Sequence, residues 1–334
     1  MDDMRRWLTD AEIAESKRIA ANDQAKKTRH HFVPQMYLRR WLIEGNSNVQ
    51  YRDVDQGRTG FGSPKSVAFQ DNFYNYNAPN APELWVETHL SRVESDAAVL
   101  LKELDNLPDG RITDQVVIDN IAIYVGLQGQ RTPRVRTVND AIETRNPSGK
   151  DPQTAAIDMA VYTWRAVVFR NFSARTAWLV SSAAPLVTCD EPVAYHGYPN
   201  WTRKKRLSLA TAALVLFPLG PHRMLVLAAD NKHIRVAEPF QLGTEEASAI
   251  NLEIAANCLQ FVFEQQNTRI ARELPIPSGT APTVGSDPNI YVATNLDTRW
   301  AAVEQSPRWP LTRWIHSTPD MQEMWQMIIQ IQSN

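Results

Sequence analysis

The sequence DQVVIDNIAIYVGLQGQRTPR, residues 114–134, predicts the centre of the molecule. Apolar side chains from Val116 to Leu127 occupy almost every face of the helix that this pattern predicts. A helix that is apolar all round is a buried helix, because every face needs an apolar neighbour. We predict that Thr113 caps its N-terminus and that it ends near Gly129. The other elements are therefore expected to pack around it.

The segments on either side of this helix differ in pattern. Apolar residues at steps of three and four predict further helices over 83–106, 133–144, 153–172, 244–258 and 321–331. Short apolar runs bounded by turn residues are more frequent in the second half, and they are typical of strands in a mostly antiparallel sheet. The predicted strands are 48–53 and 66–76 around a turn at 57–62, then 177–181, 185–189, 212–217, 224–228 and 259–264.

These patterns together predict an α+β protein. We expect a helical N-terminal half to pack on a mostly antiparallel sheet that is formed largely by the C-terminal half. The predicted organisation is an N-terminal helical arm over residues 1–27, a single α+β domain over 28–270, and a C-terminal extension over 271–334 that ends in a helix.

Composition narrows the class of protein. The chain of 334 residues has 43% hydrophobic and 22% charged residues and a formal net charge of -2, so it has no overall attraction to nucleic acid or membranes. Cys189 and Cys258 are too few for a disulfide framework. The charged N-terminus lacks the apolar core of a signal peptide, and no run approaches the roughly 20 apolar residues that span a bilayer. We therefore expect a cytoplasmic protein without a membrane partner.

Two adjacent histidines introduce the first candidate site, in HHFVPQMYLRRW, residues 30–41. An imidazole must be solvated, hydrogen-bonded or bound to a metal, so a pair of them requires an explanation. Pro34 suits the first turn of a short helix that begins beside them. We predict that His30, His31 and Gln35 are catalytic and that His31 is also a metal ligand. The alternative is an ordered pair that fixes the turn through backbone hydrogen bonds.

Arginines and glutamines form a second candidate cluster where the central helix ends. Gln128, Arg131 and Arg134 lie at a buried helix terminus, where a guanidinium is costly unless it is paired with a carboxylate or a phosphate. One interpretation is an internal ion pair with a carboxylate such as Glu94. The other is an anion clamp, in which Gln128 and Arg131 act on a phosphate.

Acidic residues follow a predicted strand at Asp190 and Glu191, directly before Pro192. A carboxylate at the end of a strand is held rigidly, which suits catalysis or metal binding. We predict that Asp190 and Glu94 are catalytic and that they hold a divalent metal ion together with His31. The alternative is a cap, in which the carboxylate accepts hydrogen bonds from nearby backbone N–H groups.

A local basic cluster lies between two predicted strands, in WTRKKR over residues 201–206. Such a cluster is either an exposed loop or a contact to a nucleic-acid backbone. The predicted nucleic-acid contacts are Arg39, Arg134, Arg203, Lys204 and Lys205.

The order of these motifs resembles a bacterial family known as domain of unknown function 4238. The resemblance covers roughly residues 28–265, with Phe32 where the family usually has tyrosine. The similar residues are His30, His31, Val33, Pro34, Tyr37 and Leu38, then FYNY at 73–76, the acidic helix with Glu87 and Glu94, QGQRTPR at 128–134, VTCDEPV at 187–193 and LFPLGPHRMLVL at 216–227. The resemblance implies one fold unit and assigns no activity.

Two functional hypotheses follow from these residues. The first is a metal-dependent phosphodiesterase or nuclease in bacterial phage defence, with Mg²⁺ or Mn²⁺ as cofactor and Arg131 stabilising phosphate charge. The second is a non-catalytic module that binds nucleic acid or protein, in which the same polar residues form a structural network. No P-loop, dinucleotide-binding turn or metalloprotease helix occurs in the sequence. Nothing in the sequence indicates an oligomeric state.

Overall fold

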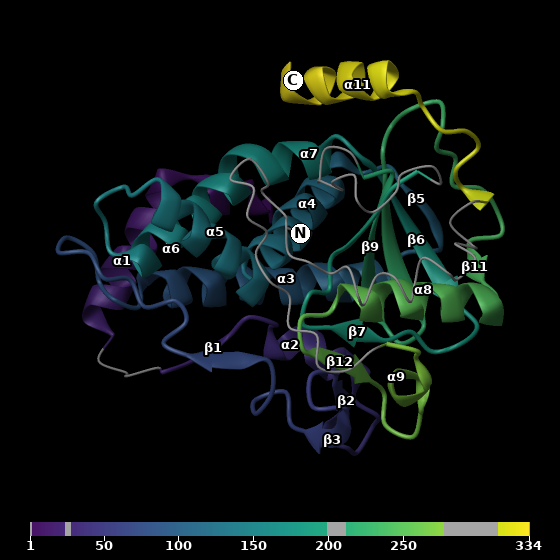
Figure 1. The fold of residues 1–334 in the computed structure, drawn as a ribbon, viewed down its shortest axis with the longest axis horizontal. Coiled ribbons are helices and arrows are strands. Elements are labelled where there is room, and N and C mark those ends of the chain that lie inside the picture. The colour runs from purple at the N-terminus through teal and green to yellow at the C-terminus, as the bar shows by residue number, and fades with distance from the viewer. Residues whose placement is uncertain (1, 24–27, 199–211, 277–312, 334) are drawn as a thin grey trace.

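The computed structural model describes residues 2–23, 28–198, 212–276 and 313–333 of the chain. It has an α+β fold, in which helices from the N-terminal half lie beside a sheet formed largely by the C-terminal half (Figure 1). The predicted fold class is therefore confirmed. Among the described residues, no helix combines the length and the apolar character needed to cross a membrane.

The helical layer is built around α4 (Gln115–Gln130), the helix predicted to be central. The residues from Ile118 to Gln128 are all buried. The N-cap is Asp114, whose side chain accepts hydrogen bonds from the N–H groups of Val116 and Val117, so the prediction of Thr113 was wrong by one residue. The other helices of the layer are η1 (Met4–Leu8), α1 (Asp10–Asn22), α2 (Gln35–Leu38), η2 (Arg39–Trp41), α3 (Trp85–Asn106), α5 (Pro133–Arg145), α6 (Pro152–Thr163), η3 (Trp164–Val168) and α7 (Phe169–Ser173).

The segment predicted as one helix over 153–172 is interrupted in the structure. It consists of α6, the π-helical turn η3 and α7. The turn packs against Gly126 of α4, where an added Cβ would lie 2.7 Å from Cγ1 of Val168. Only glycine permits this approach, and a π turn is a common device for re-aiming side chains within a helix.

Three sheets occur within the described residues, all mostly antiparallel. The largest has six strands, and its edge strand β11 is parallel to β6. The six strands are β5 (Gly110–Ile112), β6 (Thr176–Ser182), β8 (Ala194–His196), β9 (Leu214–Gly220), β10 (Arg223–Ala228) and β11 (Gln241–Leu242). The four-stranded sheet is formed by β2 (Val49–Asp53), β3 (Arg58–Gly62), β7 (Thr188–Cys189) and β12 (Phe261–Glu264), and the third sheet pairs β1 (Arg29–His31) with β4 (Phe69–Asp71).

Several predicted strand limits were wrong. Residues 58–62, predicted to belong to a turn, form strand β3, because the turn is the shorter segment 54–57 that ends at Gly57 with φ +64°. The strands predicted over 66–76 and 185–189 are reduced to β4 and β7. These segments contain apolar residues that are buried in loops, and such residues cannot be distinguished from strand residues by pattern alone.

The six-stranded sheet is covered on both faces. Along β10, Leu225 and Leu227 join the hydrophobic cluster that includes α3 and α4, whereas Met224 and Val226 join the cluster that includes α8 (Thr244–Asn257). Alternate side chains of a strand point to opposite faces, so both faces of this sheet need apolar residues. This double burial explains why the strands appear in the sequence as continuous apolar runs.

The N-terminal segment packs into the helical layer. Met4 and Trp7 are buried in the same hydrophobic cluster as α3 and α4, and the Met4 backbone N–H donates to Oδ1 of Asn120 at 2.8 Å. The division into arm, domain and extension stays a prediction. The C-terminal part contains the short helix α9 (Ile270–Glu273) and the helix α11 (Met321–Ser333), which lies at the top of the molecule in Figure 1.

Candidate functional site

The guanidinium of Arg131 connects three separate parts of the chain. It lies just after α4 and is 3% exposed. Its Nη1 donates to Oε1 of Glu94 on α3 at 2.6 Å, its Nε donates to the hydroxyl of Tyr74 at 3.2 Å, and its Nη2 donates to the carbonyl of His31. Burial alone would lower the pKa of Arg131, but Tyr74 and Glu94 raise it above its ordinary value, so the group stays charged. The predicted internal ion pair with Glu94 is therefore present.

The two predicted histidines have different environments, because successive side chains of strand β1 point to opposite faces. His30 is fully buried, its ring stacks on Tyr74, and its Nδ1 accepts the Tyr74 backbone N–H at 2.7 Å. His31 is partly exposed, and its Nε2 donates to the carbonyl of Lys65 at 3.2 Å. Both rings thus bond to the backbone, as the structural alternative required.

His31 and Glu94 form the partly exposed side of this cluster. Gln35 Nε2 lies 3.5 Å from Nδ1 of His31 and donates to it, which leaves the ring proton on Nε2. Burial lowers the pKa of His31, and the nearby charge of Glu94 opposes the shift. A neutral imidazole near a carboxylate can accept a proton, so this pair retains the chemistry of a general base once Gln35 releases Nδ1.

Asp190 belongs to a different cluster. It is 1% exposed and accepts hydrogen bonds from the backbone N–H groups of Leu259, Gln260 and Phe261 at 2.7 to 2.9 Å. Burial raises its pKa, and these three hydrogen bonds oppose the shift. The carboxylate therefore fixes the turn between α8 and β12, in the way that the capping alternative described.

Of the remaining predicted site residues that the structure describes, some are buried and one is exposed. Arg134 is buried, lies 3.8 Å from the carboxylate of Glu191 and donates to the carbonyl of Asn257, so a nucleic-acid backbone would have to displace these partners, and the predicted contact stays a prediction. Gln128 is also buried, and its amide makes no hydrogen bond within the described part of the chain. Arg39 is exposed. The predicted contacts Arg203, Lys204 and Lys205 lie outside the described residues.

The predicted metal ligands are not assembled. His31 and Glu94 lie in the Arg131 cluster, whereas the carboxylate of Asp190 is enclosed by backbone N–H groups beside β12. Within the ranges that the structure describes, no three His, Cys, Asp or Glu side chains come together in an arrangement that could hold a metal ion. The set of His31, Glu94 and Asp190 as a common site was therefore wrong.

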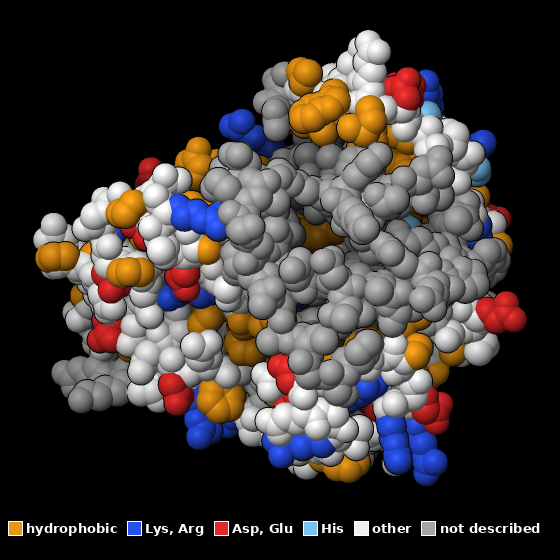
Figure 2. Space-filling view, viewed as in Figure 1, with side chains coloured by type: hydrophobic (Ala, Val, Ile, Leu, Met, Phe, Trp, Pro, Cys, Tyr) orange, Lys and Arg blue, Asp and Glu red, His pale blue; other side chains and the backbone are white. Residues whose placement is uncertain are grey.

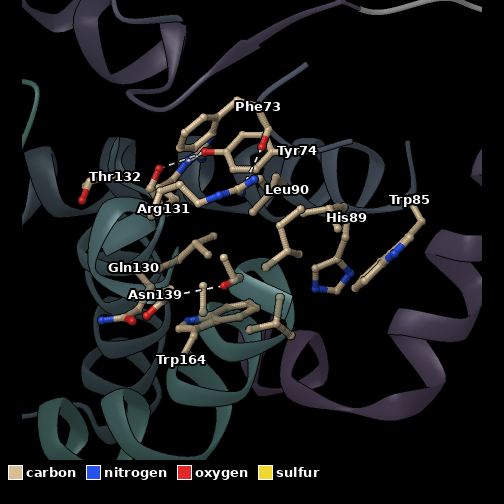
Figure 3. A pocket seen from close by; sticks show the side chains of 17 residues that line it. Phe73, Tyr74, Trp85, His89, Leu90, Gln130, Arg131, Thr132, Asn139 and Trp164 are labelled. Carbon is tan, nitrogen blue, oxygen red and sulfur yellow. Dashed lines mark hydrogen bonds between the residues drawn. The ribbon is translucent and has the colours of Figure 1, made fainter. Parts of the chain in front are cut away.

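A small cavity lies directly behind the Arg131 cluster (Figure 3). Its volume is about 50 Å³, and it lies between α3, α4, α5 and α6. One wall is formed by Phe73, Tyr74 and Arg131 (Figure 3). Trp85 and His89 lie to one side of the cavity, and Trp164 lies across it from that wall. The space exists partly because two of the four residues that α6 contributes to the lining, Ala156 and Ala160, have small side chains. Gln130, Arg136, Ala160 and Val161 line the cavity and are partly exposed, so it reaches the surface.

His89 is the histidine in this lining, and its pKa is strongly shifted. Burial lowers its pKa to about 4, and Arg92 adds to the shift. Its Nδ1 lies 3.0 Å from the hydroxyl of Ser16, which donates to the carbonyl of Glu12 and accepts from Arg92, and this arrangement favours the proton on Nδ1. Because its pKa is about 4, the His89 ring is neutral at neutral pH. Its Nε2 has no hydrogen-bond partner among the described residues.

The sequence interpretation missed this cavity. His89 occupies the apolar stripe of α3, between Val86 and Leu90, and a histidine in a buried stripe was the available signal. The two alanines of α6 give no comparable signal, because alanine is common in any helix.

Two buried groups make stability depend on pH in opposite directions. Glu191 has a pKa raised by burial from 4.5 to about 7, so the unfolded chain releases its proton before the folded protein does, and stability falls as the pH rises through this range. His89 has a pKa lowered from 6.5 to about 4, so the unfolded chain takes up a proton first, and stability falls as the pH decreases from 6.5 to about 4.

We predict that single substitutions separate the two contributions. In Glu191→Gln, the fall in unfolding free energy between pH 4.5 and 7 should become smaller by about 3.5 kcal/mol at most, because each pKa unit corresponds to about 1.4 kcal/mol. In His89→Gln, the loss below pH 6.5 should become smaller instead. Urea unfolding at pH 4.5, 5.5, 6.5 and 7.5 measures both slopes. Identical slopes in wild type and both variants would contradict this account.

The comparisons with known proteins agree with the resemblance of the motifs. No curated protein and no solved structure matches the chain. The family described as Protein of unknown function (DUF4238) matches residues 29–268, which is most of the chain and contains both the Arg131 cluster and the cavity. The protein therefore belongs to the DUF4238 family.

Proposed function

We propose that this protein is a non-catalytic binding module, and that its cavity accepts one aliphatic side chain of a protein partner. The observation that carries the proposal is the state of Arg131, whose donor groups are used by Glu94, Tyr74 and His31 inside the protein. A guanidinium held in this way is not available to a phosphate unless an internal bond breaks first. The polar network then acts as the rigid wall of the cavity.

The size and lining of the cavity support an aliphatic side chain as the ligand. A cavity of about 150 Å³ is needed to hold benzene, and this one measures about 50 Å³, so it suits a group of a few carbon atoms. Its walls are aromatic rings, including Phe73, Tyr74 and Trp164. Insertion of one apolar side chain into a lined pocket is a common way for a protein partner to be anchored.

A variant that fills the cavity tests the proposal. In Ala160→Leu, three added carbon atoms should occupy the space at the partly exposed edge and weaken binding of N-acetyl-leucinamide roughly tenfold, because about two buried methylene groups lose their place. The measurement is the shift of the Trp85 and Trp164 indole N–H signals in two-dimensional NMR. The matched control is Ala98→Leu, which adds the same atoms at an exposed position of α3.

Two results would overturn the proposal. One is the absence of any indole shift in wild type with N-acetyl-leucinamide at tens of millimolar. The other is an equal shift with N-acetyl-aspartamide, because a charged side chain should not enter an apolar cavity.

A second candidate function has one observation in its favour, the partly exposed His31 beside Glu94. This pair could act as a general base in phosphodiester hydrolysis, with Mg²⁺ or Mn²⁺ as a cofactor and nucleic acid as substrate. The bacterial phage-defence setting belongs to this candidate and stays a prediction. The test is hydrolysis of bis(p-nitrophenyl) phosphate by the wild type and by His31→Ala. Hydrolysis that requires Mn²⁺ and is lost in His31→Ala at unchanged thermal stability would favour this function over the binding module.

A further inference from the structure

A second cavity, more than ten times larger than the first, lies between α7, one end of the six-stranded sheet, and α11. Its volume is about 560 Å³, inside the range of about 300 to 1,000 Å³ that is usual for small-molecule sites. The sheet end is defined by the antiparallel register, which places Ala228 of β10 beside Thr176 of β6 and Leu214 of β9. Arg175 and Ala229, which directly adjoin these strands, line the cavity.

The wall of the cavity formed by α7 and the adjoining sheet end carries two guanidinium groups. Arg175 is buried, lines the cavity and donates from Nη2 to the carbonyl of Ala212 at 2.9 Å. Burial lowers its pKa to about 10, so it is charged at neutral pH. Arg170 of α7 also lines the cavity, is exposed, and makes no side-chain hydrogen bond or ion pair with the described residues.

The other charged residues of the described lining are one arginine, Arg5, and two aspartates, Asp119 and Asp230. Arg5 lies 3.6 Å from Asp119, but its closer partner is Asp3, which is 2.5 Å from its Nη2. Asp230 is exposed and is the remaining carboxylate among the described lining residues. Asn171 is buried, and its Oδ1 accepts no hydrogen bond within the described ranges, so it offers an acceptor to a ligand. Three arginines against two aspartates give the described lining a positive excess, and Arg170, Asn171 and Arg175 place it on the wall formed by α7 and the sheet end.

The opposite side of the cavity is apolar and belongs to α11. Met324, Met327 and Ile328 face the cavity. Methionine side chains are flexible and polarisable and adapt to ligands of different shape. The helix is fastened beside the cavity by Glu323, whose Oε2 lies 3.0 Å from Nε2 of His233 and whose Oε1 pairs with Lys232.

We propose that this cavity binds an amphipathic organic anion, with its charged group at Arg170 and Arg175 and its apolar body against Met324 and Met327. The charge of one wall and the apolar character of the other select this class of ligand, and the volume accommodates a molecule of roughly 20 non-hydrogen atoms. The site is independent of the aromatic cavity, so each can fail without the other.

The probe is 8-anilinonaphthalene-1-sulfonate, which carries a sulfonate on an apolar aromatic body and fluoresces when it leaves water. The full-length wild type should bind one molecule per chain with a micromolar dissociation constant. Uncharged N-phenyl-1-naphthylamine should bind more weakly, because it lacks the anion. Decanoate should displace the probe, whereas the same concentration of inorganic phosphate should not.

Variants locate the site. Arg170→Ala should weaken probe binding roughly tenfold, as expected for one charge-assisted contact, and Met327→Glu should weaken it further by repelling the anion. Arg170→Lys should retain most of the affinity. Gln326→Glu adds the same charge to an exposed position of α11 and should bind the probe like wild type.

The outer face of α11 requires its own control. Met321, Trp325 and Ile329 are exposed, and hydrophobic side chains gather over this helix in Figure 2. Trp325→Gln should leave probe binding unchanged, and so should Ala160→Leu, which alters only the aromatic cavity. Binding that depends on Trp325, that is indifferent to both Arg170→Ala and Met327→Glu, or that inorganic phosphate abolishes would overturn the inference.

Discussion

Replacing Arg131 with alanine should lower the free energy of unfolding by about 3–5 kcal/mol, the usual cost of removing one partner from a buried ion pair. The substitution leaves the carboxylate of Glu94, the hydroxyl of Tyr74 and the carbonyl of His31 without their donor. Each buried polar group that loses its partner costs about 1–3 kcal/mol. Urea unfolding followed by circular dichroism gives the difference directly.

Two further variants make the expectation specific. Arg131→Lys should recover only part of the stability, because an ammonium lacks the planar fork that bonds to several acceptors at once. Arg39→Ala, which removes an exposed arginine, should change the free energy of unfolding by less than about 0.5 kcal/mol. A loss of less than about 1 kcal/mol in Arg131→Ala would mean that the guanidinium is free to serve a ligand, against the proposed binding module.

Replacing Asp190 with alanine should have an effect of similar size, about 3–5 kcal/mol. The substitution removes the 1% exposed acceptor of three part-buried backbone N–H groups, those of Leu259, Gln260 and Phe261, which then lose their hydrogen-bond partner. The turn that connects α8 to β12 would loosen, and β12 carries the middle of the four-stranded sheet. Thermal unfolding measured at neutral pH would report the loss as a lower midpoint.

The matched control for this variant is Asp230→Ala, at an exposed aspartate. It should leave the midpoint nearly unchanged. Metal analysis of the wild type and of Asp190→Ala separates this structural role from the original metal hypothesis. A stable Asp190→Ala protein that loses a bound Mg²⁺ or Mn²⁺ present in the wild type would contradict the structural role.

The sequence predicted those parts of the fold that depend on local periodicity. The apolar pattern of residues 116–127 correctly indicated a buried central helix, and α3 and α8 have nearly the predicted limits. The interruption of the helix after Thr163 was not predictable, because it depends on contact with Gly126, which is distant in sequence. The limits of the short strands were predicted wrongly for the same reason, because the strands that pair with them determine where they end.

The candidate site was predicted in part for a similar physical reason. A buried arginine must have a partner, and this rule correctly suggested Glu94 for Arg131. The same rule does not say which distant backbone groups surround Asp190. The predicted metal site of His31, Glu94 and Asp190 was wrong because backbone N–H groups enclose the Asp190 carboxylate. Both cavities depend on how helices that are far apart in the chain pack together, so the sequence of any single segment does not predict them.

The position of Trp7 has a consequence for how the family should be handled in the laboratory. The matched region begins at residue 29, yet Trp7 contributes its indole N–H to Asp96 and its ring to the neighbourhood of His89. A fragment cut at residue 29 would expose the apolar surface that Met4 and Trp7 cover. The region of this chain that matches the family is therefore smaller than the unit that folds, and expression of residues 29–268 alone should yield an aggregating protein.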